Sequence, residues 1–149
     1  MGAVRDFHHV VAGHRDAMTK ERLRRYIWLK QECRQLQAYL DRIMNDMSEV
    51  TSPRLTGMPH SKEPKGLDEI VVRYEEISTR YEKRLKQYTK ETLAIEKAVE
   101  SVQDPRLRLL LRYKYMDGYK WETIADLMHY EVRWLYVLHG QALQAIEKE

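Results

Sequence analysis

Several residue types are scarce in this chain, and each scarcity excludes a class of protein. The 149 residues include one cysteine, Cys33, so no internal disulfide can form and a reducing compartment is expected. No apolar run approaches the roughly 20 residues that span a bilayer, and the N-terminus, interrupted by His8, His9 and His14, lacks a secretory hydrophobic segment. We therefore expect a cytoplasmic protein with no membrane partner.

The composition favours a folded, helical chain. Only one Phe and four Pro are present, while 43% of the residues are hydrophobic and 33% are charged, which is not the composition of a disordered protein. The formal net charge of +3 permits a polyanionic partner without requiring one.

The sequence also lacks the motifs of an enzyme. It has no Gly-rich phosphate loop, no cluster of metal-ligand spacing, and no Cys/His or Ser/His pair that spacing places together. The three N-terminal histidines fit no standard metal site, and we interpret them as surface residues. We expect no catalytic activity, no cofactor and no bound metal.

The segment 18–103 predicts a long helical hairpin. An unbroken heptad seam predicts one helix from Thr19 to about Val50, and a seven-residue row predicts a second from Leu67 to about Gln103. One connecting loop makes antiparallel pairing the economical arrangement, and the apolar stripe left over would suit a homodimer. The seam consists of Tyr26, Leu29, Cys33, Leu36, Leu40, Ile43, Met47 and Val50, and the row of Tyr74, Tyr81, Tyr88, Ile95 and Val102.

Two segments around the hairpin have weaker patterns. We interpret residues 1–17 as an appended N-terminal arm, either ordered or disordered, and as dispensable for folding. The loop 51–66 contains Pro53, Pro59 and Pro64, so helix cannot continue through it. A loop of this length is either functional, with its Gly-Met-Pro portion packed on a helix, or partly disordered.

The segment 104–149 predicts three short helices joined by tight turns. Asp104-Pro105 is typical of a helix start, and Asp117-Gly118 supplies a left-handed stop after a helix that reaches Met116. A second helix fits residues 121–128, and His129-Tyr130 leaves room only for a sharp turn before Glu131 begins the third. This spacing is that of a helix-turn-helix, whose second helix can lie in a DNA major groove.

These residues resemble the helix-turn-helix of sigma factor region 4, in the variant of small phage and prophage transcription regulators of the ArpU-like family. The resemblance covers roughly residues 18 to 147, and it implies an all-α fold: a long antiparallel helical hairpin followed by a C-terminal sigma-like helix-turn-helix domain. It rests on Leu109-Leu110-Leu111-Arg112-Tyr113-Lys114-Tyr115, Gly118, Trp121-Glu122-x-Ile124-Ala125-x-Leu127-Met128, Leu135-Tyr136-x-x-His139-Gly140-x-Ala142-Leu143, and a loop Ser52-Pro53-Arg54-Leu55-Thr56-Gly57-Met58-Pro59-His60.

The resemblance implies that double-stranded DNA is bound by the start of the last helix and by basic residues near it. Relatives usually carry several Arg, Lys or Gln at that point, whereas this chain offers Arg133 as the one strong phosphate or guanine ligand. Arg106 and Arg108 could add charge. The candidate DNA-binding residues are Tyr130, Glu131, Arg133, Trp134, Val137, His139, Arg112, Lys114 and Lys120.

Two functions from different classes therefore remain open. In the first, the protein is a phage or prophage transcription regulator whose hairpin dimerises or contacts RNA polymerase. In the second, Val132, Trp134 and Val137 form an apolar surface for protein, and the chain is a helical interaction module that adapts or inhibits a host protein.

Overall fold

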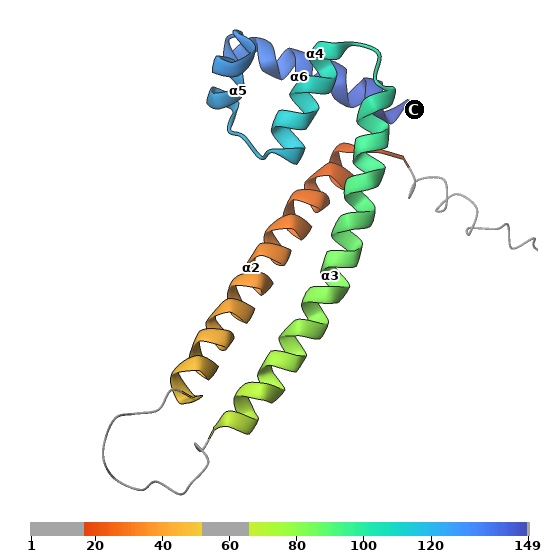
Figure 1. Ribbon diagram of the computed structural model, residues 1–149. Coiled ribbons are helices and arrows are strands. Elements are labelled where there is room, and N and C mark those ends of the chain that lie inside the picture. The colour runs from red at the N-terminus through yellow and green to blue at the C-terminus, as the bar shows by residue number, and fades with distance from the viewer. Residues whose placement is uncertain (1–16, 52–65, 149) are drawn as a thin grey trace, which may run out of the picture. The chain divides into compact units, whose positions relative to one another are not determined.

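The computed structural model describes residues 17–51 and 66–148, and every regular element in these two stretches is a helix (Figure 1). The predicted all-α class is confirmed. None of the described helices is both long and apolar enough to cross a membrane. The elements are α2 (Lys20–Thr51), α3 (Leu67–Ser101), α4 (Pro105–Leu111), the π-helix η1 (Arg112–Met116), α5 (Trp121–Met128) and α6 (Val132–Glu147).

The two long helices begin and end within two residues of the predicted bounds. Thr19 accepts a hydrogen bond on its hydroxyl from the backbone N–H of Arg22, 3.2 Å away, and so caps the start of α2. Gly66, at φ +114°, precedes α3. The predicted arm 1–17, apart from Ala17, and the loop 51–66, apart from Thr51 and Gly66, lie outside the described residues.

The chain divides into two compact units. We call residues 28–89 the hairpin unit, and the described residues outside that range, which comprise the start of α2, the end of α3 and helices α4 to α6, the terminal unit. The division falls inside both long helices, so each helix contributes residues to both units.

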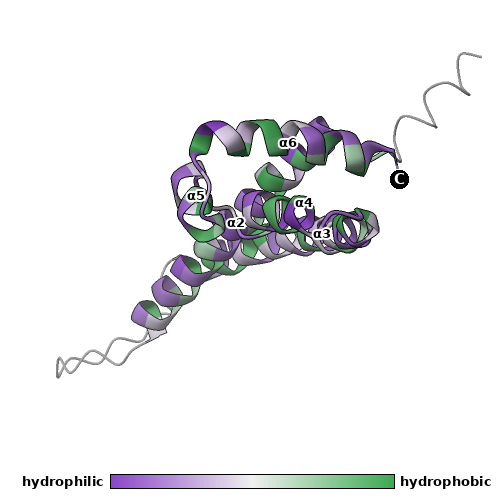
Figure 2. Ribbon diagram, turned by 90° about the horizontal axis from the view of Figure 1, so that it is seen from above, coloured by the Kyte–Doolittle hydropathy of each residue, from purple (hydrophilic) through white to green (hydrophobic). Residues whose placement is uncertain are grey.

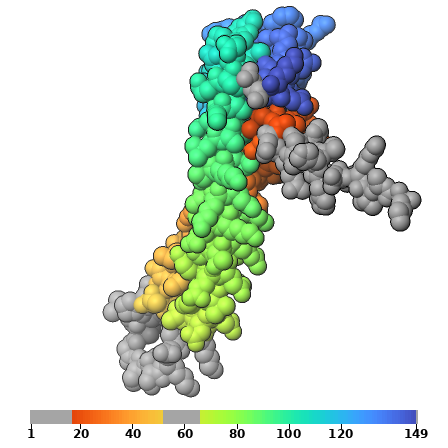
Figure 3. All heavy atoms as spheres, turned by 90° about the vertical axis from the view of Figure 1, so that its right-hand side faces the viewer, coloured from red at the N-terminus to blue at the C-terminus, as the bar shows by residue number. Residues whose placement is uncertain are grey.

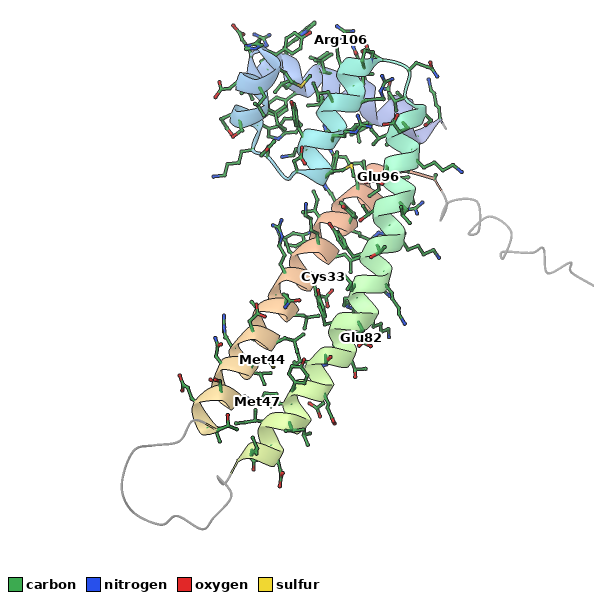
Figure 4. The ribbon with its side chains drawn as sticks, in the orientation of Figure 1. Cys33, Met44, Met47, Glu82, Glu96 and Arg106 are labelled. Atoms are coloured by element: carbon green, nitrogen blue, oxygen red, sulfur yellow. The ribbon has the colours of Figure 1, made fainter. Side chains whose placement is uncertain are left out.

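In the hairpin unit, α2 and α3 run antiparallel, as predicted. The guanidinium of Arg84 donates to the Glu32 carboxylate at 2.8 Å, which joins the two helices. The predicted seam of α2 is the buried face: Cys33, Leu36, Leu40 and Ile43 are all buried. Cys33 lies on the side of α2 that faces α3 (Figure 4), and burial raises the pKa of its thiol.

The α3 side of the hairpin unit is less completely covered. Tyr74, Tyr81 and Tyr88 are half-buried, as expected for rings that pack on a seam while their hydroxyls reach the rim. No α3 residue from Leu67 to Ala94 is fully buried. Figure 3 shows a continuous face of α3 at the molecular surface.

The core of the terminal unit draws on helices far apart in the sequence. Arg22 and Glu91 form an ion pair at 2.9 Å, and the Thr92 hydroxyl donates to the Tyr26 hydroxyl at 3.2 Å, so the start of α2 lies beside α3. The fully or almost fully buried residues of this unit are Met18, Leu23, Tyr26, Ile95, Val99, Val102, Leu107, Leu110, Leu111, Tyr115, Ile124, Ala125, Leu135, Leu138, Ala142 and Ile146.

Candidate nucleic-acid interface

The first of the three short helices begins where the sequence predicts. Asp104 has an extended backbone, and its carboxylate accepts the backbone N–H of Arg106 at 2.9 Å. Pro105 occupies the first helical turn, where its missing N–H leaves no bond unmade. Hydrogen bonds from Arg106, on its side chain and its backbone, lower the pKa of the Asp104 carboxyl, which therefore stays ionised as a cap.

This helix ends differently from the prediction. Its extent to Met116 is as expected, but the last five residues form the π-helix η1, in which the backbone N–H of Asp117 bonds Arg112 O at 2.9 Å. Gly118 then reverses the chain at φ +74°, a conformation that an L side chain rarely adopts, so the predicted glycine stop is confirmed.

A sharp turn separates α5 from α6. His129 ends α5 in the left-handed region at φ 57°, ψ 40°, and the backbone N–H of Tyr130 bonds Ala125 O at 3.0 Å, which closes the helix end. Histidine is among the few residues other than glycine that occupy this region with some frequency. Glu131 is already the N-cap position of α6, so only three residues connect the two helices.

Helix α6 has one buried and one exposed face, and Figure 2 shows hydrophilic and hydrophobic residues interspersed along it. Its predicted core face is confirmed, since Leu135, Leu138, Ala142 and Ile146 are buried. On the opposite face the exposed residues Arg133, Tyr136, Val137, Gly140 and Gln144 recur at helical spacing. A β-carbon added to Gly140 would meet nothing within 4 Å, so its backbone is open to close approach.

Large apolar side chains are also exposed on this unit. Trp134 is 51% exposed and Leu127 is 46% exposed. Leu127 also lines an open cleft of about 310 Å³, together with Pro105, Arg106, Leu109, Met128 and Tyr130. Exposed apolar side chains of this kind suit a protein contact as much as a DNA contact.

An aromatic cluster joins η1, α5 and α6. The Tyr115 hydroxyl lies 2.7 Å from Nε2 of His139, and the Trp121 ring meets the His139 ring edge-on with centroids 5.0 Å apart. The ammonium of Lys114 lies 4.4 Å from the centre of the Trp121 ring, a cation–π contact. His139 and Lys114, both predicted to contact DNA, are therefore held within the terminal unit.

The cluster is uncharged at His139 and Tyr115 near neutral pH. Burial, followed by the charges of Lys20, Lys114 and Arg24, lowers the pKa of His139 from 6.5 to about 4. Burial raises the pKa of Tyr115 to about 12. Burial also lowers the pKa of Lys114, although Glu122 opposes that effect.

Several of the expected phosphate-binding cations have partners inside the protein. Arg106 pairs with Asp104 at 2.8 Å, and Arg108 donates to Val102 O at 2.7 Å. Arg112 forms an ion pair with Glu100. Among the described residues, Arg133 and Lys120 are exposed cations for which the structure shows no such pairing.

Two cations from a distant part of the sequence lie close to α6. Lys20 and Arg24, on the first turns of α2, lie near enough to His139 of α6 to lower its pKa. Both side chains are exposed. Together with Lys114 they form what we call the basic rim, a group of three cations beside α6.

The structure thus places the candidate residues in different parts of the terminal unit. Arg133 and Val137 share the exposed face of α6, whereas Trp134 lies to one side of it and Glu131 and half-buried Tyr130 lie in the preceding turn. Lys114 and His139 belong to the aromatic cluster, Arg112 is paired with Glu100, and Lys120 occupies the N-cap position of α5 without a side-chain capping bond. Tyr136 and Gly140 complete the exposed face, and their register with Arg133 could have predicted them.

Comparison with models of known protein families, with curated proteins and with solved structures found no match.

Proposed function

We propose that this protein is a DNA-binding transcription regulator of the phage or prophage type, which inserts α6 into the major groove of double-stranded DNA. The observation that carries the proposal is the basic rim, whose cations lie close to His139 of α6. Lys20 and Arg24, which are exposed on α2, supply phosphate-neutralising charge that α6 lacks, whereas Lys114 of the rim is half-buried against Trp121.

The exposed face of α6 has chemistry suited to base edges. Arg133 can donate two hydrogen bonds to guanine O6 and N7, and Val137 can pack on a thymine methyl group. Tyr136 presents a hydroxyl, and Gly140 lets the backbone of the helix come close to a phosphate or a groove wall. In this proposal the hairpin unit dimerises or contacts RNA polymerase.

The test uses duplexes selected from a random-sequence pool by retention on the full-length protein. Affinity for the selected duplex should fall linearly with salt on a logarithmic scale. Arg133→Ala should weaken binding at least tenfold and relax the preference at one base pair, since one bidentate base contact is worth about 1–3 kcal/mol. Arg80→Ala, which removes an exposed arginine of α3 in the hairpin unit, should leave the affinity unchanged.

Absence of salt-dependent binding to any selected duplex would contradict the proposal. Equal losses in the Arg133 and Arg80 variants would contradict the docking of α6, because only Arg133 lies on its exposed face.

A second function is favoured by the exposed apolar side chains of Trp134 and Leu127. Under this proposal the terminal unit binds a host protein as an adaptor or inhibitor. The neighbours Arg133 and Trp134 distinguish the two functions: Arg133→Ala should abolish DNA selection in the first, and Trp134→Ala should abolish binding of a purified protein partner in the second. Each substitution should leave the other activity intact.

A further inference from the structure

The hairpin unit exposes its largest apolar side chain to solvent. Trp28 is 69% exposed, the highest exposure of any large hydrophobic residue in the described parts of the chain. An exposed Trp in this position adds nothing to the core of its own unit, whereas Trp is among the residues that contribute most to protein interfaces.

A pocket of about 380 Å³ opens on the same unit, between α2 and α3. Tyr39 and Ile43 line it from α2, and Ile77 lines it from α3. The guanidinium of Arg42 lies 5.4 Å from the centre of the Tyr39 ring, so the aromatic wall also carries a cation. The pocket could receive one more aromatic side chain, whose ring would meet Tyr39 and Arg42.

Trp28 and this pocket lie on one side of α2. Tyr39 follows Trp28 by about three helical turns, which places both on the same face with an axial separation of about 16 Å. Trp28 and the pocket therefore lie on a single surface. At that distance Trp28 cannot reach the pocket of its own chain. A second copy turned by 180° can supply it.

We propose that the pocket lined by Tyr39, Ile43 and Ile77 receives Trp28 of a second copy of this chain, so that two hairpin units associate about a two-fold axis near Gln35. Gln35 is exposed and lies midway between Trp28 and Arg42 on the same face. Antiparallel pairing of the two α2 helices about that point brings Trp28 of each copy over Arg42 of the other, at the pocket.

The charges around the pocket suit a second copy. Arg42 and Arg73 are balanced there by Asp46 and Glu76, so two identical surfaces do not repel each other. A strongly acidic or basic partner would find no matching excess of charge. The α2 segment of the hairpin unit is about 36 Å long. Side by side, α2 and α3 make a face about 20 Å wide, so this length of the hairpin can bury roughly 700 Å² per copy, close to the usual ~800 Å² of a stable interface.

Solution mass by sedimentation equilibrium, measured without DNA, tests the association. The parent protein should be a dimer, and Trp28→Ala should raise the dimer dissociation constant at least tenfold. Trp134→Ala, which removes the exposed Trp of the terminal unit, should leave it unchanged. A monomeric parent, or a Trp28→Ala protein that dimerises like the parent, would overturn the proposal. Neither result bears on DNA binding by α6.

Cross-linking then tests the position of the two-fold axis. Gln35 and Gln37 are both exposed on α2, but they point to nearly opposite faces because they are two residues apart. Gln35→Cys should be joined to its counterpart by a short bis-maleimide, whereas Gln37→Cys should not. The parent protein is the negative control, because its one cysteine, Cys33, is buried and should not be cross-linked. Failure of Gln35→Cys to cross-link, or equal cross-linking at position 37, would exclude this axis.

Discussion

The hydroxyl of Tyr115 lies 2.7 Å from Nε2 of His139 and joins the π-helix η1 to α6. The pKa of Tyr115 is raised to about 12 by burial, so the hydroxyl keeps its proton and donates the hydrogen bond. The pKa of His139 is lowered to about 4, mainly by burial, so the imidazole is neutral and Nε2 accepts. The second ring nitrogen, Nδ1, then carries the hydrogen of the neutral ring. The bond thus adds a specific polar contact between η1 and α6 to the packing of the buried face of α6.

Removal of this hydrogen bond should destabilise the terminal unit. Tyr115→Phe takes away the donor and leaves Nε2 of half-buried His139 without its partner, which should cost about 1–2 kcal/mol of unfolding free energy. Urea unfolding followed by circular dichroism measures the change. Tyr136→Phe is the matched control, because its hydroxyl belongs to an exposed side chain and its removal should cost less than about 0.5 kcal/mol. Equal stability of the two variants would show that the Tyr115 bond contributes nothing.

The lowered pKa of His139 predicts how stability depends on pH. Between about pH 6.5 and 4 the unfolded chain binds a proton at this histidine and the folded chain does not, so stability decreases as the pH falls. Above the pKa of His139 in the unfolded chain, about 6.5, the free energy of unfolding is not reduced by this group. As the pH falls toward 4, the free energy of unfolding decreases progressively, by roughly 2 kcal/mol once partial solvent exposure is allowed for.

His139→Gln separates this effect from other titrations. The amide does not titrate, so the variant should lose the decline between pH 6.5 and 4 while other pH effects remain. Chemical unfolding at a series of pH values measures both slopes. An unchanged slope in His139→Gln would assign the pH dependence to other groups.

Features encoded by local spacing were predictable from the sequence. The heptad seam identified the buried face of α2, including Cys33, because apolar residues three and four apart must share a helix face. The glycine stop at Gly118 followed from the one residue type that tolerates positive φ at no steric cost. The core face of α6 followed from the same periodicity.

Features that depend on tertiary packing were not predictable in this way. His139 lies at the edge of the core face of α6, where polarity alone does not say whether a side chain turns inward or outward. The structure turns its Nε2 toward Tyr115, whose own position depends on the π-helical turn. The nearness of Lys20 and Arg24 to α6 depends on the chain returning after the whole length of the hairpin, and no local pattern encodes it.

The two glycines of the terminal unit should respond oppositely to alanine. Gly118 has φ +74°, so Gly118→Ala should destabilise the unit by about 1 kcal/mol through backbone strain. Gly140 lies within α6, where a β-carbon meets nothing, so Gly140→Ala should stabilise it by about 1 kcal/mol. Thermal unfolding measures both changes.

Gly140→Ala has a second expected effect under the proposed DNA docking. The added methyl group projects from the exposed face of α6, so affinity for a selected duplex should decrease although the fold becomes more stable. Greater stability with unchanged affinity would mean that the backbone at Gly140 makes no close contact with DNA.

The basic rim should determine the salt dependence of DNA binding. Lys20→Ala combined with Arg24→Ala removes two exposed cations beside α6, and each phosphate that is no longer neutralised should lower the slope of log affinity against log salt by about 1. The double substitution should therefore lower the slope by about 2, with little change in which sequences are preferred, because phosphate contacts carry no base information.

The control removes the same charge from the hairpin unit. Arg80→Ala with Lys83→Ala deletes two exposed cations of α3, and it should leave the slope unchanged. The rim variant should also raise the pKa of His139, because Lys20 and Arg24 both lower it, and an NMR titration of the imidazole shows this without DNA. If the pKa rises while the salt slope stays constant, the two cations lie beside α6 as described and do not contact phosphate. If both change, the rim serves DNA binding by bringing the charge of α2 to a helix whose own sequence supplies only Arg133.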